Sequence, residues 1–258
     1  MRSASHFLTL LFVLVFSLPT TALASEIIDS DGDKLSDQEE TMVYHTDPKI
    51  SDTDGDGIAD GEEVKNGFSP LHAYNQKLSD VDTDGDGLTD ALEIALGANL
   101  VNIDTDGDNH PDAAEVFTGY NPLKGNRDRS VSRHVEVDLD KQQIHYFMNG
   151  VKLGSAPVST GLRKWATPTG EFEIIRKRPV LHYRGADYNY PNTKWNLEFK
   201  RSFYIHGAYW HNQFGKRPMS HGCVNMAYKD VEKIYNFLDV GDKVKVYGKT
   251  PLRVVATK

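Results

Sequence analysis

The chain has 258 residues, of which 39% are hydrophobic, with a single cysteine and a formal net charge of -8 at pH 7. This composition supplies enough apolar residues for one sizeable core or two smaller ones, and it excludes a disulfide scaffold and a multi-span membrane protein. Residues 26–125 hold 25 acids and 5 bases, whereas residues 126–258 hold 12 acids and 23 bases. Such a division predicts two modules with different chemistry.

The first 25 residues have the pattern of a secretory signal. Arg2 precedes the apolar residues 7–18, and the small residues Ala22 and Ala24 follow a proline. The apolar run is well below the roughly 20 residues that cross a bilayer core, which disfavours a retained membrane anchor. We therefore expect residues 1–24 to be a cleaved signal peptide. The product is expected in the periplasm or cell envelope of a bacterium, without stable membrane insertion.

A pattern of five carboxylates occurs four times in the acidic half, at positions 1, 3, 5, 9 and 12 of each copy. The side chains are Asp29, Asp31, Asp33, Asp37 and Glu40; Asp52, Asp54, Asp56, Asp60 and Glu63; Asp82, Asp84, Asp86, Asp90 and Glu93; and Asp104, Asp106, Asp108, Asp112 and Glu115. In a tight loop, alternate Asp side chains point toward one centre and a distant Glu can close the shell. Hard oxygen ligands in this number predict structural calcium ions.

Position 6 of each copy must turn sharply. It is Gly57, Gly87 and Asn109 in the last three copies, and these residue types tolerate positive φ. In the first copy it is Lys34, so we expect that copy to be the weakest calcium site.

The loops resemble those of EF-hands but differ in two respects. The apolar residue stands at position 7 rather than position 8, and the flanking segments are too short for pairs of full helices. Residues 29–123 are instead similar to bacterial thrombospondin type 3 repeats, which implies an array with little secondary structure that calcium ions hold together. A disordered acidic linker is the alternative. Four registered copies with placed glycines disfavour it.

Strand-like patterns begin at Arg133. Hydrophobic residues alternate with polar ones over residues 135–139, and Asn149-Gly150 is a hairpin signal. Further strands are expected at residues 144–147, 172–175, 203–205 and 244–247, and a helix with one apolar face at 231–238. We therefore expect a mostly β domain over residues 131–248, joined to the array (26–125) by residues 124–130 and followed by a tail at 249–258.

The single cysteine, Cys223, lies in the run Ser220-His221-Gly222-Cys223, and His206-Gly207 precede it. A thiol nucleophile requires an imidazole to accept its proton, and an acyl oxyanion requires backbone N–H donors that a neighbouring glycine can present. An inert buried cysteine is the alternative. An exported cysteine without an intrachain partner favours reactivity instead, so these residues indicate nucleophilic catalysis that needs no cofactor.

These residues, with Ser159-Thr160-Gly161 and residues 167–172, resemble the signature of YkuD-type L,D-transpeptidases over residues 131–248. The resemblance implies a β-sandwich or barrel with a helix after the nucleophile. It implies the following roles: Cys223 as nucleophile, His206 as general base, the Gly207 carbonyl as the group that orients His206, and the N–H groups of Gly222 and Cys223 as oxyanion donors.

The remaining signature residues have less definite roles. Ser220 and His221 are expected to shape the loop or to hydrogen-bond the substrate, and for His221 a purely structural role is an equal alternative. Asn225 stands where many members of the family carry Arg. Tyr209, Trp210, Asn225 and Arg217 are expected to contact the substrate.

The implied reaction is acyl transfer in peptidoglycan biosynthesis, which serves cell wall biogenesis and cell shape. Cys223 would attack the third residue of a stem peptide, usually meso-diaminopimelate, and expel the terminal D-Ala. An amine of a second stem or of an envelope protein would then take the acyl group. Water as acceptor would make the enzyme an L,D-carboxypeptidase. A rival of another class is a non-catalytic, calcium-dependent cell-wall-binding or adhesion protein, which the intact signature disfavours. No nucleic acid partner is expected.

Overall fold

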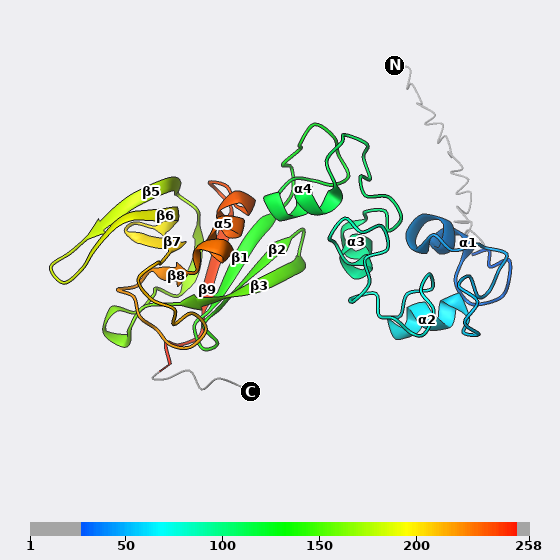
Figure 1. The fold of residues 1–258 in the computed structure, drawn as a ribbon, viewed down its shortest axis with the longest axis horizontal. Helices are drawn as coiled ribbons and strands as arrows, with labels where there is room; N and C mark the ends of the chain where they lie inside the picture. Colours follow the sequence, from blue (N-terminus) through cyan, green and yellow to red (C-terminus); the bar gives the residue numbers. More distant parts are fainter. Residues whose placement is uncertain (1–26, 252–258) are drawn as a thin grey trace, which may run out of the picture.

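The computed structural model describes residues 27–251, so the predicted signal peptide and most of the predicted tail lie outside the described residues. The Asp-rich repeats form one end of the molecule and the β domain the other, and the last repeat helix lies between them (Figure 1). In this part of the chain no helix has both the length and the apolar character needed to cross a membrane.

The repeat array consists of loops and short helices. The helices are α1 (Asp37–Glu39), the π-helix η1 (Glu40–Tyr44), α2 (Asp60–Asn66), α3 (Asp90–Leu96) and α4 (Asp112–Thr118). The last three begin at the position-9 Asp of their copy and end at a left-handed glycine, where no Cβ opposes the turn. Position 12 falls in the first turn of each helix, and helical side chains lean toward the N-terminus. The Glu at position 12 is therefore directed back toward its loop.

The sharp turn expected at position 6 is present in all four copies. Its φ angle is 96° at Gly57, 108° at Gly87, 73° at Asn109 and 81° at Lys34. A left-handed conformation costs a residue with a bulky side chain about 1–2 kcal/mol, which glycine avoids. The first loop therefore carries backbone strain that the two loops with glycine at position 6 lack.

Within residues 27–251, nine strands form one mixed sheet that curls in space (Figure 1). In spatial order they are β4 (Gly170–Glu173), β9 (Lys243–Tyr247), β1 (Arg133–Asp138), β2 (Gln143–Met148), β3 (Val151–Ser159), β8 (Val224–Met226), β7 (Phe203–Gly207), β6 (Asn189–Lys200) and β5 (Arg176–Arg184). Neighbours are antiparallel except for the pairs β1 with β9 and β7 with β8. The expected mostly β domain is confirmed.

Most of the expected elements are present with small shifts. Asn149-Gly150 joins β2 to β3, and the expected helix is α5 (Tyr228–Phe237). The long hairpin of β5 and β6 was not predicted, because β5 is basic and largely exposed and so lacks the alternation of a half-buried strand. Strand β8 was also missed, since its three residues are all buried and show no period.

The core of the β domain continues into the array. Helix α5 buries Val231, Ile234 and Phe237. The same apolar cluster includes four residues of the third and fourth copies, namely Leu88, Leu96, Ala113 and Val116. Residues 124–130, expected as a linker, therefore run beside a packed interface.

Candidate active site and calcium loops

The sheet brings the candidate nucleophile and base together. Strands β7 and β8 are parallel neighbours, and their register pairs His206 with Asn225. Cys223 is the residue immediately before β8 and lines the same cavity as His206, whose volume is about 80 Å³. The full lining is Tyr183, Tyr188, Tyr190, His206, Trp210, Met219, Ser220, His221, Cys223 and Asn225.

His206 is held as a neutral imidazole. Its side chain is only 3% exposed, and Nδ1 lies 2.9 Å from the carbonyl oxygen of Gly207. A carbonyl oxygen can only accept, so Nδ1 carries the proton and Nε2 keeps its lone pair. Burial lowers the pKa of His206 to about 4, although the hydrogen bond to Gly207 acts in the opposite direction. The imidazole is therefore uncharged at neutral pH and its tautomer is fixed.

Cys223 is held as a neutral thiol. Part of its side chain is accessible from the cavity, but the surrounding protein excludes most water. This burial raises the pKa of Cys223 to about 11, and a backbone hydrogen bond from Tyr204 offsets only part of the rise. At neutral pH the resting pair is thus thiol and imidazole, so a proton must move when the thiol reacts.

Ser220 fixes the loop that carries the cysteine. Its Oγ donates to the carbonyl oxygen of Cys223 at 2.6 Å and accepts from the N–H of Gly222 at 3.1 Å. Gly222 has φ of 117°, and a Cβ there would lie 2.6 Å from the ring of Phe203. The loop therefore requires glycine at this position, while the N–H expected as an oxyanion donor is engaged by Ser220.

His221 connects this loop to the β5–β6 hairpin. Its Nε2 lies 3.4 Å from Oδ2 of Asp187, which is in the hairpin turn. Its ring lies against Trp165 on one side, at 4.0 Å between centroids, and near Tyr188 at 5.1 Å. His221 thus contacts both the covering hairpin and the 3₁₀ turn η2 (Arg163–Trp165).

An aromatic wall covers the cavity, and sequence reasoning found only part of it. Trp210 lines the cavity as expected and stacks on Tyr190 at 3.8 Å. Tyr209 is 51% exposed and lies beyond the lining, where its hydroxyl donates to Pro191. The missed lining tyrosines flank the turn of the β5–β6 hairpin, so recognising that hairpin was the signal that could have found them.

The other two expected substrate contacts differ in placement. Asn225 is 2% exposed and lines the cavity, with Nδ2 at 3.1 Å from Nε2 of His211. Within the described residues its buried Oδ1 has no hydrogen-bond partner. Arg217 lies outside this lining, in a neighbouring groove with Arg163 and Lys164.

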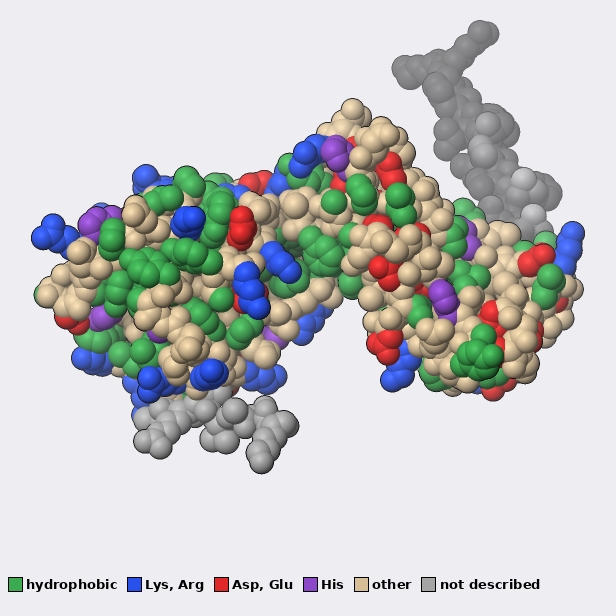
Figure 2. Space-filling view, in the orientation of Figure 1, with side chains coloured by type: hydrophobic (Ala, Val, Ile, Leu, Met, Phe, Trp, Pro, Cys, Tyr) green, Lys and Arg blue, Asp and Glu red, His purple; other side chains and the backbone are tan. Residues whose placement is uncertain are grey.

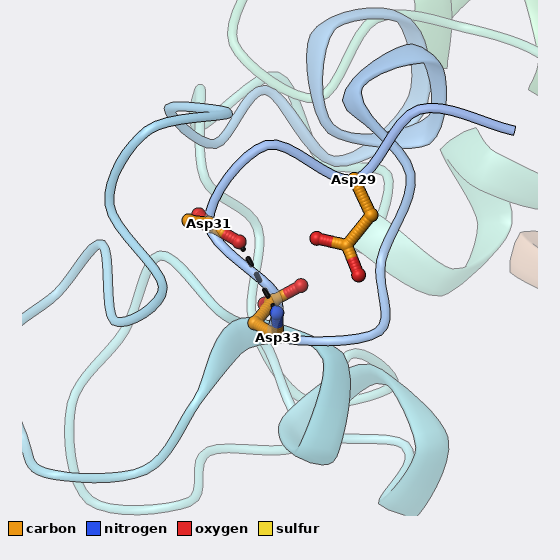
Figure 3. A group of neighbouring side chains, drawn as sticks. All are labelled: Asp29, Asp31 and Asp33. Carbon is orange, nitrogen blue, oxygen red and sulfur yellow. Dashed lines mark hydrogen bonds between the residues drawn. The ribbon is translucent and has the colours of Figure 1, made fainter.

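The first three carboxylates of every repeat converge. In each copy, oxygens of positions 1, 3 and 5 come within 4.8 Å of one another, and Figure 3 shows Asp29, Asp31 and Asp33 facing one centre. These side chains also accept hydrogen bonds from N–H groups of their own loop, such as Gly32 to Asp29 at 2.7 Å. The backbone thus helps to orient these carboxylates.

The Glu at position 12 of each loop is consistent with a cation site. Glu63 and Glu93 are fully buried, and both oxygens of each have no hydrogen-bond partner among residues 27–251. Burial and the neighbouring Asp charges raise the pKa of each to about 8. Glu115 is similar, with a pKa raised to about 7. Buried carboxylates without partners are costly, and a bound cation would remove that cost. The oxygen-only donor set fits calcium.

The Asp at position 9 has a different environment from the other carboxylates. Both oxygens of Asp60 accept hydrogen bonds from Thr53, from its N–H at 2.8 Å and its hydroxyl at 2.6 Å. Thr83 and Asp90 repeat the arrangement in the third copy. Residues at position 9 therefore clamp the loop onto its helix, although the sequence pattern suggested that they bind the ion.

The comparisons with known proteins agree with this division. Residues 132–246 match the L,D-transpeptidase catalytic domain family, and residues 29–49, 52–67 and 82–99 match the bacterial TSP3 repeat. The curated "Probable L,D-transpeptidase 3" of Mycobacterium tuberculosis is 26% identical over 115 residues, which is 40% of this chain and 41% of that protein. The chain thus matches less than half the length of this relative.

Two solved structures are also similar. An L,D-transpeptidase from Mycobacterium smegmatis is 24% identical, covers 46% of this chain and 59% of its own, and has a TM-score of 0.44. An L,D-transpeptidase in complex with imipenem is 22% identical, covers 45% and 59%, and has a TM-score of 0.43.

The family matches define a cysteine-dependent class of enzyme. Residues 132–246 are an L,D-transpeptidase catalytic domain, and the array that precedes it consists of bacterial TSP3 repeats. The fourth Asp-rich copy, residues 104–115, lies beyond the matched repeats but has the same convergent carboxylates.

Proposed function

We propose that the chain is an exported transferase that acts on peptidoglycan stem peptides through Cys223 and His206. The observation that carries the proposal is the neutral His206, held by Gly207 in the tautomer of a base, in one cavity with the only thiol of the chain. The family match gives the class of reaction. The basic surface of the catalytic domain (Figure 2) suits a substrate that carries carboxylates.

The reaction proceeds in two balanced steps. Sγ of Cys223 bonds to the carbonyl carbon of the third stem residue while Nε2 of His206 takes the thiol proton. The bond to the terminal D-Ala breaks, and His206 returns the proton to the leaving amine. An acceptor amine then attacks the thioester, and its proton passes through His206 to the departing thiol.

The backbone N–H of Cys223 is our choice for the main oxyanion donor. Its neighbour, the Gly222 N–H, already donates to Ser220. A preorganised N–H near the developing charge stabilises the transition state without reorganisation. Ser220 and Gly222 act as positioning residues for this donor.

The remaining contacts select the substrate. The free Oδ1 of Asn225 accepts a hydrogen bond from a substrate N–H, and Trp210 packs on the stem. Tyr209 and Arg217 lie outside the cavity lining, so they meet more distant parts of the substrate. His221 holds the covering hairpin close to the loop that bears the nucleophile.

Calcium is the proposed ion of the array. Positions 1, 3, 5 and 12 of each copy supply the ligands, because the first three carboxylates converge and the fourth has at least one buried oxygen without a hydrogen-bond partner among the described residues. When bound, calcium neutralises these carboxylates and holds each loop to its helix. Asp37, Asp60, Asp90 and Asp112 support the loops from outside the ligand shell.

Incubation of residues 25–258 with disaccharide tetrapeptide, followed by mass spectrometry, tests the reaction. We expect loss of D-Ala, an acyl adduct on Cys223 and a cross-linked dimer. Disaccharide tripeptide without dimer would show an L,D-carboxypeptidase instead. An unchanged substrate and an unmodified protein would favour the non-catalytic cell-wall-binding alternative.

A further inference from the structure

The fourth repeat packs directly onto the helix that follows the candidate nucleophile. Helix α4 contacts α5, and α3 contacts β3 (Figure 1). A Cβ on Gly119, at the end of α4, would overlap the carbonyl oxygen of Phe237, at the end of α5. Leu88 and Val116 are fully buried in the shared cluster, and burial of a side chain of this kind contributes about 1.5–3 kcal/mol. The two modules thus share a close-packed interface.

Two arginines tie the helix ends together. Arg129 donates to the carbonyl oxygens of Thr118 on α4 and Phe237 on α5, both at 3.0 Å. Arg133 donates to the Gly119 carbonyl at 2.6 Å. The last carbonyls of a helix lack partners within it and carry partial negative charge, so the guanidinium groups stabilise both ends.

The fourth calcium loop is fastened to the segment that carries these arginines. Asp108, at position 5, accepts from the N–H of His110 in its own loop at 3.0 Å and from that of Asn126 at 2.9 Å. In the third copy, the equivalent Asp86 accepts at 2.7 Å from Ala113 of the next repeat. The same carboxylate position therefore ties a loop to the segment that follows, which in the fourth copy leads into β1.

Helix α5 extends this connection to the active site. At its N-terminal end, Tyr228 packs so closely on Gly207 that a Cβ on the glycine would overlap the tyrosine ring. The Gly207 carbonyl is the group that orients His206. Beyond its C-terminal end, the Leu238 carbonyl accepts from Lys177 at 2.5 Å, and Lys177 lies on β5 of the covering hairpin.

We propose that the fourth repeat is an integral part of the catalytic domain: calcium in residues 104–115 fixes α4 on α5, and α5 in turn holds the Gly207 carbonyl and the covering hairpin. This inference rests on the calcium binding proposed above. Among the described residues, the first two copies contribute no side chain to the shared cluster, so they extend from this unit as an arm.

Hydrogen exchange of residues 25–258, with calcium and with chelator, tests the coupling. We expect calcium to protect α5 and β7 as well as the array. The protection factor of α5 should rise by up to about 100-fold when free calcium is 100 times the dissociation constant of the fourth loop. Glu115→Gln should abolish the effect at α5. Glu40→Gln, the matched change in the first copy, should leave it intact.

Two glycine variants separate docking from calcium binding. Gly119→Ala and Gly67→Ala both place a Cβ at a helix end with nearly the same φ, 81° and 79°. Only the Cβ at position 119 meets α5, because nothing lies within 4 Å of the one at position 67. We expect Gly119→Ala to bind calcium in its array while α5 exchange no longer responds, and Gly67→Ala to keep the response.

The outcomes distinguish the two proposals. Elemental analysis that finds no calcium would overturn the calcium sites themselves. Calcium that binds and protects the array but leaves α5 and β7 exchange unchanged would overturn only the coupling. An equal effect of Glu40→Gln and Glu115→Gln on α5 exchange would also overturn the coupling. The first copy, which does not contact α5, would then affect that helix as much as the fourth copy, which does.

Discussion

The ring of Tyr183 stacks on that of His206, with 4.7 Å between centroids and 27° between planes. Tyr183 comes from the hairpin strand β5, whereas His206 belongs to β7 two strands away. The covering hairpin therefore shields the His206 imidazole directly, and this shielding contributes to the burial that keeps the imidazole neutral.

The first prediction concerns the acid limb of catalysis. His206 acts as a base in its neutral form, and its pKa is lowered to about 4, so kcat/KM should stay high down to about pH 5 and fall as pH drops through about 4. Tyr183→Ala should move this limb toward pH 6.5, because water would reach the His206 imidazole and its pKa would rise toward the ordinary value. Tyr183→Phe keeps the stacked ring and should leave the limb in place. A wild-type limb near pH 6.5 would contradict the buried neutral base.

The second prediction concerns thiol reactivity. Because the pKa of Cys223 is raised from 9.0 to about 11, the thiolate fraction at pH 7 should be about 100-fold below that of a free cysteine. Alkylation by iodoacetamide should be correspondingly slow at pH 7 and accelerate up to about pH 11. Unfolded protein provides the control rate. Fast labelling of the folded protein at pH 7 would indicate a thiolate–imidazolium pair instead.

The third prediction concerns the nucleophile. Carbapenems should acylate Cys223, with the β-lactam C–N bond opening and the nitrogen taking the thiol proton, so intact mass should increase by the mass of the drug. Cys223→Ala should show no adduct and the same far-UV spectrum, and His206→Ala should lose nearly as much rate. An adduct on the Ala variant would place the reactive group elsewhere.

The fourth prediction concerns the loop that carries Cys223. Ser220→Ala removes the hydroxyl that bridges Gly222 and Cys223, leaving buried backbone groups unsatisfied at a cost of about 1–3 kcal/mol in unfolding free energy. Acylation should slow as the Cys223 N–H loses its fixed direction. Ser220→Thr keeps the hydroxyl and is the matched variant. Equal stability of the Ala and wild-type proteins in urea denaturation would show that the bridge does not hold the loop.

The fifth prediction concerns chelation. Without calcium the carboxylates of the array are no longer neutralised by bound cations. The third and fourth copies still bury apolar side chains in the shared cluster. Limited proteolysis in chelator should therefore cut residues 29–67 first and residues 82–123 later. Simultaneous cleavage of all four copies would mean that the apolar interface gives no independent protection.

Sequence patterns predicted local features well and contacts between modules poorly. The turn at position 6 was predicted from residue type alone, because a turn depends on local sterics. The sequence could not show that the Thr53 hydroxyl donates a hydrogen bond to the Asp60 carboxylate, because each of these groups has several possible partners nearby. The hairpin β5–β6 was missed because its exposed, basic strand has no core-facing pattern.

The docked fourth repeat was unpredictable for a related reason. Val116 reads as an ordinary apolar residue of a short helix, and nothing in its neighbours shows that it meets α5. Arg129 and Arg133 bind helix carbonyls, and nothing in the sequence around them indicates these partners. Contacts of this kind depend on three-dimensional placement, which composition and periodicity do not encode.

The ties between repeats have a consequence for how the array can vary in length. Asp33 of the first copy accepts a hydrogen bond from the N–H of Gly61 in the second, and Asp86 of the third accepts one from Ala113 in the fourth. Asp56 of the second copy instead accepts from Tyr74, which lies in the segment between the second and third copies. The array is therefore built from two-copy units. A chain that begins at residue 68 should retain the contact between the fourth repeat and α5, together with the catalytic domain. An inserted pair of repeats should lengthen the arm formed by the first two copies and leave both of these unchanged.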